Sequence, residues 1–320
     1  MRSWAAVVNL SVVIVNWNVE ELLCRCLSSL LRPRSFSQGL EVIVVDNASA
    51  DGSLEMVRSQ FAEVRLIASE SNEGFGRASN RGWAASSGRY VLFLNPDTEV
   101  LGDALTVMVS YLDVHESVAV VGPQLLYPGG QIQSSRRRFH SLAMALFEST
   151  VLEQWWPSNP YARRYRMADT PDDVEQQVDW LVGACLLVRR AVLADIGGFD
   201  EGFFMYSEEM DLCRRIKEAA GQVVFLPGAK VLHHEGKSSE QVVPARHVHF
   251  ETSKVLYFRR HHGRLQAEFL RLFLLATYLW RMLGEAVKWS VGHKRPLRAA
   301  RVAAYARVLQ SRLVPARTHS

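Results

Sequence analysis

The first 125 residues alternate between continuous apolar runs and segments in which apolar residues recur every three or four positions. Continuous runs are typical of strands buried on both faces, and the second pattern is typical of amphipathic helices. Strands are predicted at residues 10–15, 41–45, 64–68, 90–94 and 118–121. Helices are predicted after Asn18, an expected N-cap, and at residues 54–60, 77–86 and 105–112. This order indicates an α/β fold with a mostly parallel sheet and helices on both faces.

The pattern becomes less regular in the middle of the chain. The pattern predicts a loop-rich region at residues 123–177, with a hairpin at Gly129-Gly130. Regular elements then return, and they are predicted as a strand at residues 178–188 interrupted by Gly183, a helix at residues 208–220, and two strands at residues 223–226 and 230–233.

The last 60 residues carry an amphipathic pattern. Nine apolar residues fall on one broad face of a helix: Leu265, Phe269, Leu272, Phe273, Ala276, Leu279, Trp280, Leu283 and Val287. The uncharged run at residues 272–280 is too short to span a bilayer. Two interpretations stay open, because the helix can pack its apolar face on the rest of the protein or lie in the plane of a membrane.

Charge distribution favours the membrane interpretation. The net charge is only +4, but residues 259–320 contain 13 Lys and Arg against 2 Asp and Glu, which leaves a body of net charge −7. The basic extension would face anionic lipid headgroups; it consists of Lys294, Arg295, Arg298, Arg301, Arg307, Arg312 and Arg317. A hydrophobic content of 48% excludes a disordered chain, a fibre and a polytopic membrane protein.

The four cysteines, Cys24, Cys26, Cys185 and Cys213, suggest no disulfide framework in a chain of 320 residues. Buried thiols in a reducing compartment fit this usage, so a cytoplasmic location is predicted. The basic triplet at residues 136–138 is short and lacks nearby stacking residues, so no nucleic-acid partner is expected.

Polar side chains follow three of the predicted strands. Asn16 and Asn18 follow the first strand, Asp46 and Asn47 follow the second, and Asn95 and Asp97 follow the fourth. Ligands of open α/β sheets bind beyond the carboxyl ends of the strands, so these groups suit a polyhydroxylated or nucleotide ligand with a divalent cation. The alternative is that Asp46 and Asp97 only cap the turns that follow them.

Further ionisable groups occur in the second half. Glu208, Glu209 and Asp211 lie at a predicted helix start, where acids are also favoured by the helix dipole, and one of them could serve as a general base. His233-His234 follows a predicted strand and offers a metal ligand or a proton acceptor. Gly74-Phe75-Gly76 only approximates a dinucleotide fingerprint, which argues against a Rossmann dehydrogenase.

Six segments in succession resemble the family 2 glycosyltransferases, and within them a bacterial rhamnosyltransferase-like branch. They are SVVIVNWN (11–18), EVIVVDNASADGS (41–53), NEGFGRASNRG (72–82), YVLFLNPDTEV (90–100), WLVGACLLVRR (180–190) and GGFDEGFFMYSEEMDLCRR (197–215). The resemblance implies the A-type glycosyltransferase fold, a nucleotide-diphospho-sugar transferase with one Rossmann-like sheet, followed here by a helical tail. It places a catalytic domain at residues 1–262, with sugar-donor and acceptor halves that meet near residue 125, and the tail at residues 263–320.

The resemblance also implies roles for individual residues. Asn16 and Asp46 would contact the base and ribose of the nucleotide. Asn95-Pro96-Asp97 occupies the position of the family's Asp-x-Asp motif. Asn replaces the first Asp, so Asn95 would contact the nucleotide sugar and Asp97 would carry the metal contact, with His233 completing a Mg²⁺ or Mn²⁺ site.

The catalytic base is implied at Glu209, where the family's usual residue is Asp. The longer side chain moves the carboxylate by about 1 Å, a shift that can affect catalysis, and Glu208 and Asp211 stay as alternatives. The expected reaction is inverting, metal-dependent transfer of a sugar, with rhamnose expected from the branch.

The expected sugar donor is dTDP-rhamnose or a UDP-sugar, and the expected acceptor is a glycan or polyprenyl-linked hydroxyl in cell-envelope polysaccharide synthesis. The enzyme would lie at the inner face of the cell membrane, attached peripherally through its tail. The competing hypothesis is a non-catalytic module that binds sugar nucleotides or glycans.

Overall fold

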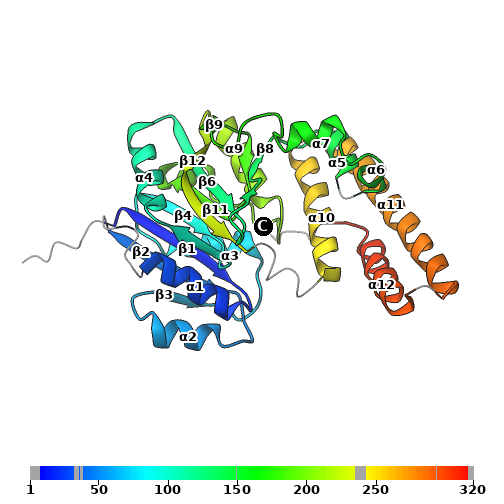
Figure 1. Ribbon diagram of the computed structural model, residues 1–320, viewed down its shortest axis with the longest axis horizontal. Coiled ribbons are helices and arrows are strands. Elements are labelled where there is room, and N and C mark those ends of the chain that lie inside the picture. Colours follow the sequence, from blue (N-terminus) through cyan, green and yellow to red (C-terminus); the bar gives the residue numbers. More distant parts are fainter. Residues whose placement is uncertain are drawn as a thin grey trace, which may run out of the picture. The chain divides into compact units, whose positions relative to one another are not determined.

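The computed structural model describes residues 8–31, 36, 39–148, 150–234, 243–292 and 294–315 of the 320-residue chain. The chain consists of two compact units (Figure 1). The first falls within residues 1–139, 169–200 and 209–238, and the second within residues 140–168, 201–208 and 239–320. The domain boundaries expected near residues 125 and 262 stay predictions.

The first unit holds the sheet and most of its covering helices. Its first half contains β1 (Leu10–Asn16), α1 (Glu20–Leu31), β2 (Leu40–Asp46), α2 (Ser53–Gln60), β3 (Arg65–Ala68), α3 (Phe75–Ala84), β4 (Tyr90–Leu94), β5 (Thr98–Leu101), α4 (Ala104–Val114) and β6 (Val118–Leu126). Its second half contains β7 (Ile132–Gln133), β8 (Arg136–Arg137), β9 (Gln176–Gln177), β10 (Trp180–Leu181), β11 (Cys185–Arg189), α8 (Arg190–Ile196), α9 (Glu208–Glu218) and β12 (Gln222–His233).

The main sheet has the strand order β3-β2-β1-β4-β11-β6-β12-β5, with β7 and β9 pairing at β6 and β12. All strands of this path run in one direction except β11 and β5, which lie antiparallel to their neighbours. The expected α/β fold with a mostly parallel sheet is therefore confirmed, and the two reversed strands make the sheet a mixed one.

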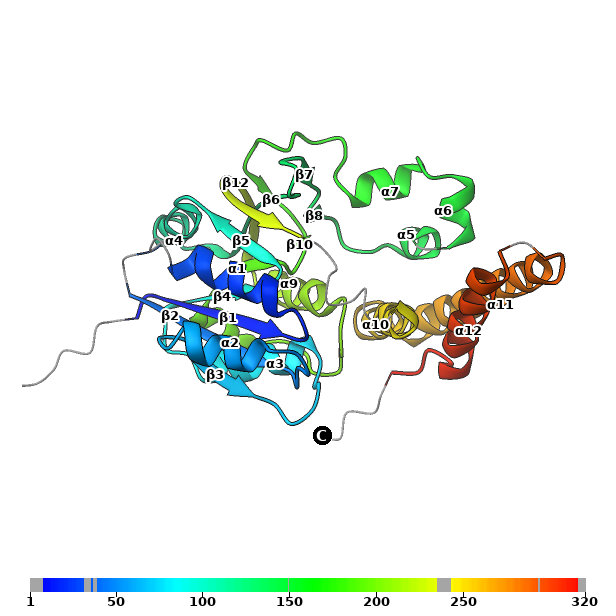
Figure 2. The same cartoon turned by 60° about the horizontal axis from the view of Figure 1, so that its bottom comes forward.

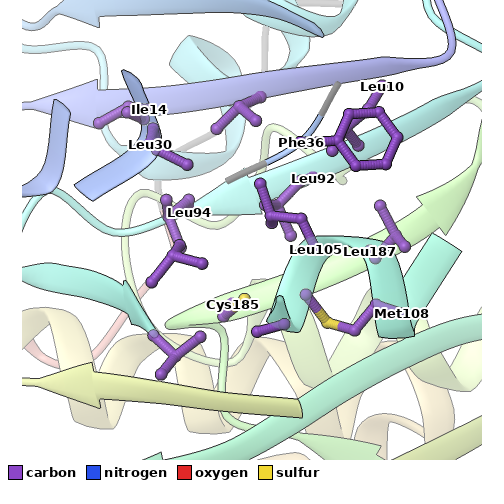
Figure 3. Packing of buried hydrophobic residues seen from close by; sticks show 14 of the residues in the cluster. Leu10, Ile14, Leu30, Phe36, Leu92, Leu94, Leu105, Met108, Cys185 and Leu187 are labelled. Carbon is purple, nitrogen blue, oxygen red and sulfur yellow. The ribbon is translucent and has the colours of Figure 1, made fainter. Parts of the chain in front are cut away.

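The main core covers one face of this sheet. Leu10 and Ile14 of β1 and Leu92 of β4 are buried there with residues of α1, α2 and α4 (Figure 3). On the other face, α3 approaches so closely that a Cβ atom on Gly82 would lie 2.3 Å from Cγ1 of Val13. Glycine allows this contact because it has no side chain.

The expected N-cap of the first helix is wrong. The helix α1 begins at Glu20, whose backbone N–H donates to Oδ2 of Asp51 at 3.0 Å. Asn18 adopts a left-handed conformation with φ of 53°, and its Oδ1 accepts from the N–H of Ala50 at 2.7 Å. Asn and Asp tolerate this conformation, so Asn18 shapes the loop after β1 instead of capping the helix.

Two other expectations need correction in the second half. The strands expected at residues 223–226 and 230–233 form one strand, β12, with an irregularity between Leu226 and Lys230. The region expected to be loop-rich contains three short helices, α5 (Leu142–Phe147), α6 (Val151–Trp155) and α7 (Pro160–Tyr165). Their length of five or six residues is too short for a helical period to be visible in the sequence.

The second unit contains these three helices together with α10 (Val243–His261), α11 (Arg264–Ser290) and α12 (Arg295–Ser311), which pack against one another (Figure 2). Lys254 of α10 is 1% exposed, and its Nζ lies 3.0 Å from Oε2 of Glu148 and 3.2 Å from Oε2 of Glu251. Burial lowers the pKa of Lys254, but the two carboxylates outweigh it and raise the pKa overall. This buried ion cluster joins α10 to the segment that follows α5.

The amphipathic helix expected in the tail is present as α11, which has 27 residues. It buries Ala267, Leu270 and Leu274 on one side. The side chains of the predicted apolar face include seven that are 45–89% exposed: Leu265, Phe269, Leu272, Leu279, Trp280, Leu283 and Val287. These seven residues are called the α11 stripe below. Among the described residues, no helix combines the length and the hydropathy that crossing a bilayer requires.

Candidate functional site

The ends of β1 and β2 hold a network of buried polar side chains. Asn16 pairs with Asp46 in the strand register, and both residues are at most 1% exposed. Nδ2 of Asn16 donates to Oδ1 of Asp46 at 2.9 Å and to Oγ of Ser49 at 3.1 Å. The other oxygen of Asp46 accepts from the N–H of Ser49 at 2.9 Å. Asp46 thus caps the turn after β2, as the alternative interpretation of the sequence expected. It also fixes the orientation of the Asn16 side-chain amide.

The fixed amide of Asn16 leaves one acceptor unused. Its Oδ1 atom is buried and has no hydrogen-bond partner among the described residues. An unsatisfied buried acceptor is costly, so such an atom indicates a position where a ligand donates a hydrogen bond. Asn47, 2% exposed, donates to the carbonyl oxygen of Gly74 at 3.0 Å and so joins this turn to the start of α3.

The ends of β4 and β12 bring a carboxylate and an imidazole together. Asp97 lies between β4 and β5, and His233 ends β12, which pairs with β5. Nε2 of His233 lies 3.4 Å from Oδ1 of Asp97, and both side chains are about 5% exposed. The N–H of His234 donates to the carbonyl oxygen of Asp97 at 2.9 Å, which fixes the two segments side by side.

The donor set of Asp97 and His233 fits a divalent metal that is shared with a ligand. Carboxylate oxygen suits Mg²⁺ and Mn²⁺, and imidazole is also accepted by first-row transition metals, so Mn²⁺ agrees with both donors. Among the described residues, no three His, Cys, Asp or Glu side chains gather into a metal cluster. Two protein donors alone would not fill the coordination shell of such an ion.

Asn95 connects the end of β4 to the segment before β11. Its N–H donates to the carbonyl oxygen of Ala184 at 2.9 Å, and its own carbonyl oxygen accepts from the hydroxyl of Thr98 at 2.7 Å. The backbone of Asn95 is thus held on both sides.

Glu209 lies at the start of α9, against the gap between β10 and β11. A Cβ atom on Gly183 would lie 3.4 Å from Cβ of Glu209, so the two backbones are close. Oε2 of Glu209 is buried and has no hydrogen-bond partner among the described residues. Burial raises the pKa of the Glu209 carboxyl, while the backbone N–H groups of Gly183 and Met210 and the charge of Arg137 oppose the rise. A carboxylate with a raised pKa and a free buried oxygen is suited to accept a proton.

The other acids of this cluster have different surroundings. Oδ2 of Asp211, whose side chain is 2% exposed, accepts from Nε of Arg215 at 2.8 Å. Arg215 also donates to the carbonyl oxygens of Ile196 and Gly198. Asp211 is therefore part of a structural ion pair and is a poor candidate for a base. Glu208 is buried at 5% exposure but belongs to the segment of the second unit.

Comparison with known proteins identifies the family of this chain. The profile of the family described as "Glycosyl transferase family 2" matches residues 11–197, which contain the polar ends of β1, β2 and β4 but neither Glu209 nor His233. The chain is a family 2 glycosyltransferase. The resemblance read from the six sequence segments is thereby confirmed.

Two relatives indicate the branch of the family that this sequence resembles. The glycosyltransferase is 32% identical over 267 residues to the N-acetylglucosaminyl-diphospho-decaprenol L-rhamnosyltransferase of Mycobacterium tuberculosis, an alignment that covers 79% of this chain and 85% of the relative. It is 23% identical over 242 residues to the rhamnosyltransferase WbbL of Escherichia coli, covering 70% of this chain and 82% of the relative. The chain is therefore a rhamnosyltransferase-like member of the family.

Solved structures show the same fold. A mannosyltransferase from Pyrobaculum calidifontis in complex with GDP-Man and Mn²⁺ superposes with a TM-score of 0.56 at 16% identity, covering 97% of this chain and 86% of that chain. GalNAc-T7 with UDP, GalNAc and Mn²⁺ superposes with a TM-score of 0.55 at 17% identity, covering 82% of this chain and 52% of that chain. The expected A-type glycosyltransferase fold is thus confirmed.

Two residues of the glycosyltransferase's candidate site were not predicted from the sequence. Gln133 of β7 is 7% exposed, and its Oε1 lies 2.9 Å from Nδ1 of His233. This contact leaves Nε2 of the imidazole directed at Asp97. A hydrogen bond to one ring nitrogen fixes the orientation of the ring and leaves the other nitrogen for a metal or a carboxylate. Arg137 was seen only as part of a basic triplet, although its charge acts on Glu209. Both residues lie in strands of only two residues, β7 and β8, which give no periodic signal that could have revealed either role.

Replacing Arg137 with Gln is expected to shift the acidic limb of the pH–activity profile to higher pH. Arg137 lowers the pKa of Glu209, so loss of its charge raises that pKa further and keeps the carboxyl protonated to a higher pH. The measurement is kcat against pH, with Arg138→Gln as the matched control because Arg138 pairs with Asp179 at 3.7 Å. A profile of Arg137→Gln that coincides with the wild-type profile would contradict the assignment of the limb to Glu209.

Proposed function

We propose that this glycosyltransferase transfers a sugar with inversion, in a metal-dependent reaction in which Glu209 is the general base. The observation that carries the proposal is the carboxylate of Glu209, which combines a buried oxygen without a partner and a raised pKa in a family 2 glycosyltransferase. A single displacement needs one such base and no covalent nucleophile.

In this reaction, Glu209 takes the proton of an acceptor hydroxyl as the hydroxyl oxygen forms a bond to the anomeric carbon. The bond between that carbon and the phosphate oxygen breaks on the opposite side, and its electron pair stays on the leaving nucleoside diphosphate. Asn16 and Asp46 would hold the base and ribose, and Asn95 would contact the nucleotide sugar. Asp97 and His233 would hold Mg²⁺ or Mn²⁺, which when bound neutralises charge on the diphosphate. Two structural neighbours were solved in complex with Mn²⁺.

We propose rhamnose as the transferred sugar and a polyprenyl-linked glycan of the cell envelope as the acceptor. The names of the relatives support this choice, since two of them are rhamnosyltransferases and one acts on a decaprenol-linked substrate. The sugar donor would be dTDP-rhamnose, with a UDP-sugar as the alternative. A membrane-bound acceptor and the exposed α11 stripe together favour peripheral attachment to the cytoplasmic face of the cell membrane.

The test is a transfer assay with the full chain, Mn²⁺ and a panel of dTDP-, UDP- and GDP-sugars, with N-acetylglucosaminyl-diphospho-polyprenol as acceptor. We expect release of nucleoside diphosphate from one class of sugar donor and a product whose anomeric configuration, measured by NMR, is inverted. Retention of configuration would contradict the single displacement. Binding of a sugar nucleotide without hydrolysis or transfer would instead support the non-catalytic module.

A further inference from the structure

Four arginine side chains line one cavity of the second unit. The cavity has a volume of about 370 Å³ and lies among Arg259 near the end of α10, Arg264 and Arg271 of α11, and Arg312 just after α12. The remaining lining residues contribute one carboxylate, that of Glu268, and apolar side chains. The cavity therefore concentrates positive charge in one small volume.

Most of this charge has no counterion among the residues that the structure describes. Oε2 of Glu268 lies 2.8 Å from Nε of Arg271. Nη1 of Arg271 donates to the carbonyl oxygen of Arg312 at 3.0 Å. Arg259 and Arg264 form no ion pair with any residue that the structure describes. Several guanidinium groups around one cavity repel each other unless an anion lies between them, and their planar forks match the oxygens of a phosphate.

The cavity borders the α11 stripe. Leu265, Phe269 and Leu272 each follow directly after a residue of the cavity lining, Arg264, Glu268 and Arg271 respectively. On a helix, positions related by steps of three and four residues form rows, so the two sets form neighbouring rows along α11. These three apolar side chains are 89%, 54% and 58% exposed. A basic cavity and an exposed apolar row thus lie side by side on one helix.

We propose that this cavity binds the phosphate group of an anionic lipid while the α11 stripe enters the interfacial layer of the membrane. In-plane amphipathic helices bury their apolar face near the headgroups, and flanking arginines reach the lipid phosphates. The charge of the cavity is complementary to that of an anionic headgroup. The inference specifies how the proposed membrane attachment is made, and it does not depend on the reaction catalysed.

A second copy of the chain is a poorer occupant of the stripe. Partner helices in coiled coils are selected by charged residues on both sides of the apolar seam. In α11, Leu272, Leu279 and Leu283 would form such a seam. Beside it lie Trp280 and Val287, which are apolar instead of charged and are 64% and 63% exposed. Aromatic and aliphatic residues here widen the apolar face, which suits a lipid layer better than a helix of defined register.

The experiment measures binding of the full chain to vesicles by flotation, without sugar donor or acceptor. One set of vesicles contains phosphatidylcholine with about one third phosphatidylglycerol, and the other contains phosphatidylcholine alone. The variant Arg259→Gln/Arg264→Gln is expected to bind the anionic vesicles about 30-fold more weakly than the wild type. The matched control, Arg301→Gln/Arg307→Gln, removes the same charge from exposed positions of α12 outside the cavity. The proposal assigns the lipid contact to the cavity instead of to the whole basic extension, so this control is expected to change binding less than threefold.

Equal weakening by the two double variants would overturn the cavity as the binding site, because it would indicate only the overall charge of the tail. Equal binding to both kinds of vesicle would overturn the role of the lipid anion. Titration with inorganic phosphate is a further measurement. If phosphate binds in a way that requires Arg259 and Arg264, and the chain does not bind vesicles, the cavity is a site for a free anion. Leu272→Ser should weaken vesicle binding; if it instead dissociates a dimer measured by sedimentation, the stripe is an interface between copies. A chain that fails to transfer sugar but passes these tests leaves this inference intact.

Discussion

Glu209→Gln is expected to lower kcat by about 10⁴-fold while the dissociation constant of the sugar nucleotide changes by less than threefold. Glutamine keeps the size of the side chain but cannot accept a proton from the acceptor hydroxyl, and general-base catalysis contributes up to about 10⁴-fold. The buried Oε2 atom makes no hydrogen bond to the described protein that the substitution would break. The measurement is a steady-state assay of transfer combined with calorimetric titration of the nucleotide.

Two further variants separate the base from its surroundings. Glu218→Gln on the same helix removes an exposed carboxylate paired with Arg214 at 2.7 Å and should leave kcat unchanged. Glu209→Asp should retain more activity than Glu209→Gln, because it keeps a carboxylate in a position shifted by about 1 Å, although such a shift can itself cost about 100-fold. Wild-type turnover by Glu209→Gln would exclude Glu209 and leave Glu208 as the remaining acid, since Asp211 is held by Arg215.

The strength of the local pattern explains which parts of the fold could be predicted. The strand at residues 90–94 was predicted with its observed bounds, because an apolar run that stops at Asn95-Pro96 has few alternative structures. The strand β5 was missed, since Thr98–Leu101 is four residues long and carries Glu99 within it. The pairing of β11 between β4 and β6 was also beyond prediction, because the residues that pair are between 66 and 99 positions apart and the pairing depends on the packing of the whole sheet.

The candidate site was predictable where topology alone brings residues together. Asn16 and Asp46 end adjacent parallel strands, so their contact follows from the strand order. His233 and Asp97 are 136 positions apart, and the family resemblance rather than any spacing suggested that they meet. The roles of Gln133 and Arg137 depend on the three-dimensional positions of single side chains near His233 and Glu209, which no pattern in the sequence encodes.

Asp97→Asn is expected to lower kcat/KM by about 10³-fold and to weaken Mn²⁺ binding in the presence of the sugar nucleotide by a similar factor. Asp97 is the carboxylate that lies 3.4 Å from His233, and only these two protein side chains are proposed to hold the ion. Loss of one anionic ligand removes several kcal/mol of stabilisation from the metal and from the charge that develops on the leaving diphosphate. Asparagine preserves the shape of the side chain, so the fold should be retained.

Measurement of free Mn²⁺ by electron paramagnetic resonance gives an affinity that is independent of turnover. Glu99→Gln is the matched control, because Glu99 lies two residues further on and pairs with His234 at 2.8 Å instead of His233. We expect Glu99→Gln to bind Mn²⁺ as the wild type does, and chelation to abolish transfer by the wild type. If Asp97→Asn binds Mn²⁺ normally while transfer is lost, Asp97 acts on the nucleotide sugar directly. If transfer is insensitive to chelation, the reaction is independent of a divalent metal, and Asp97 and His233 act on the diphosphate directly.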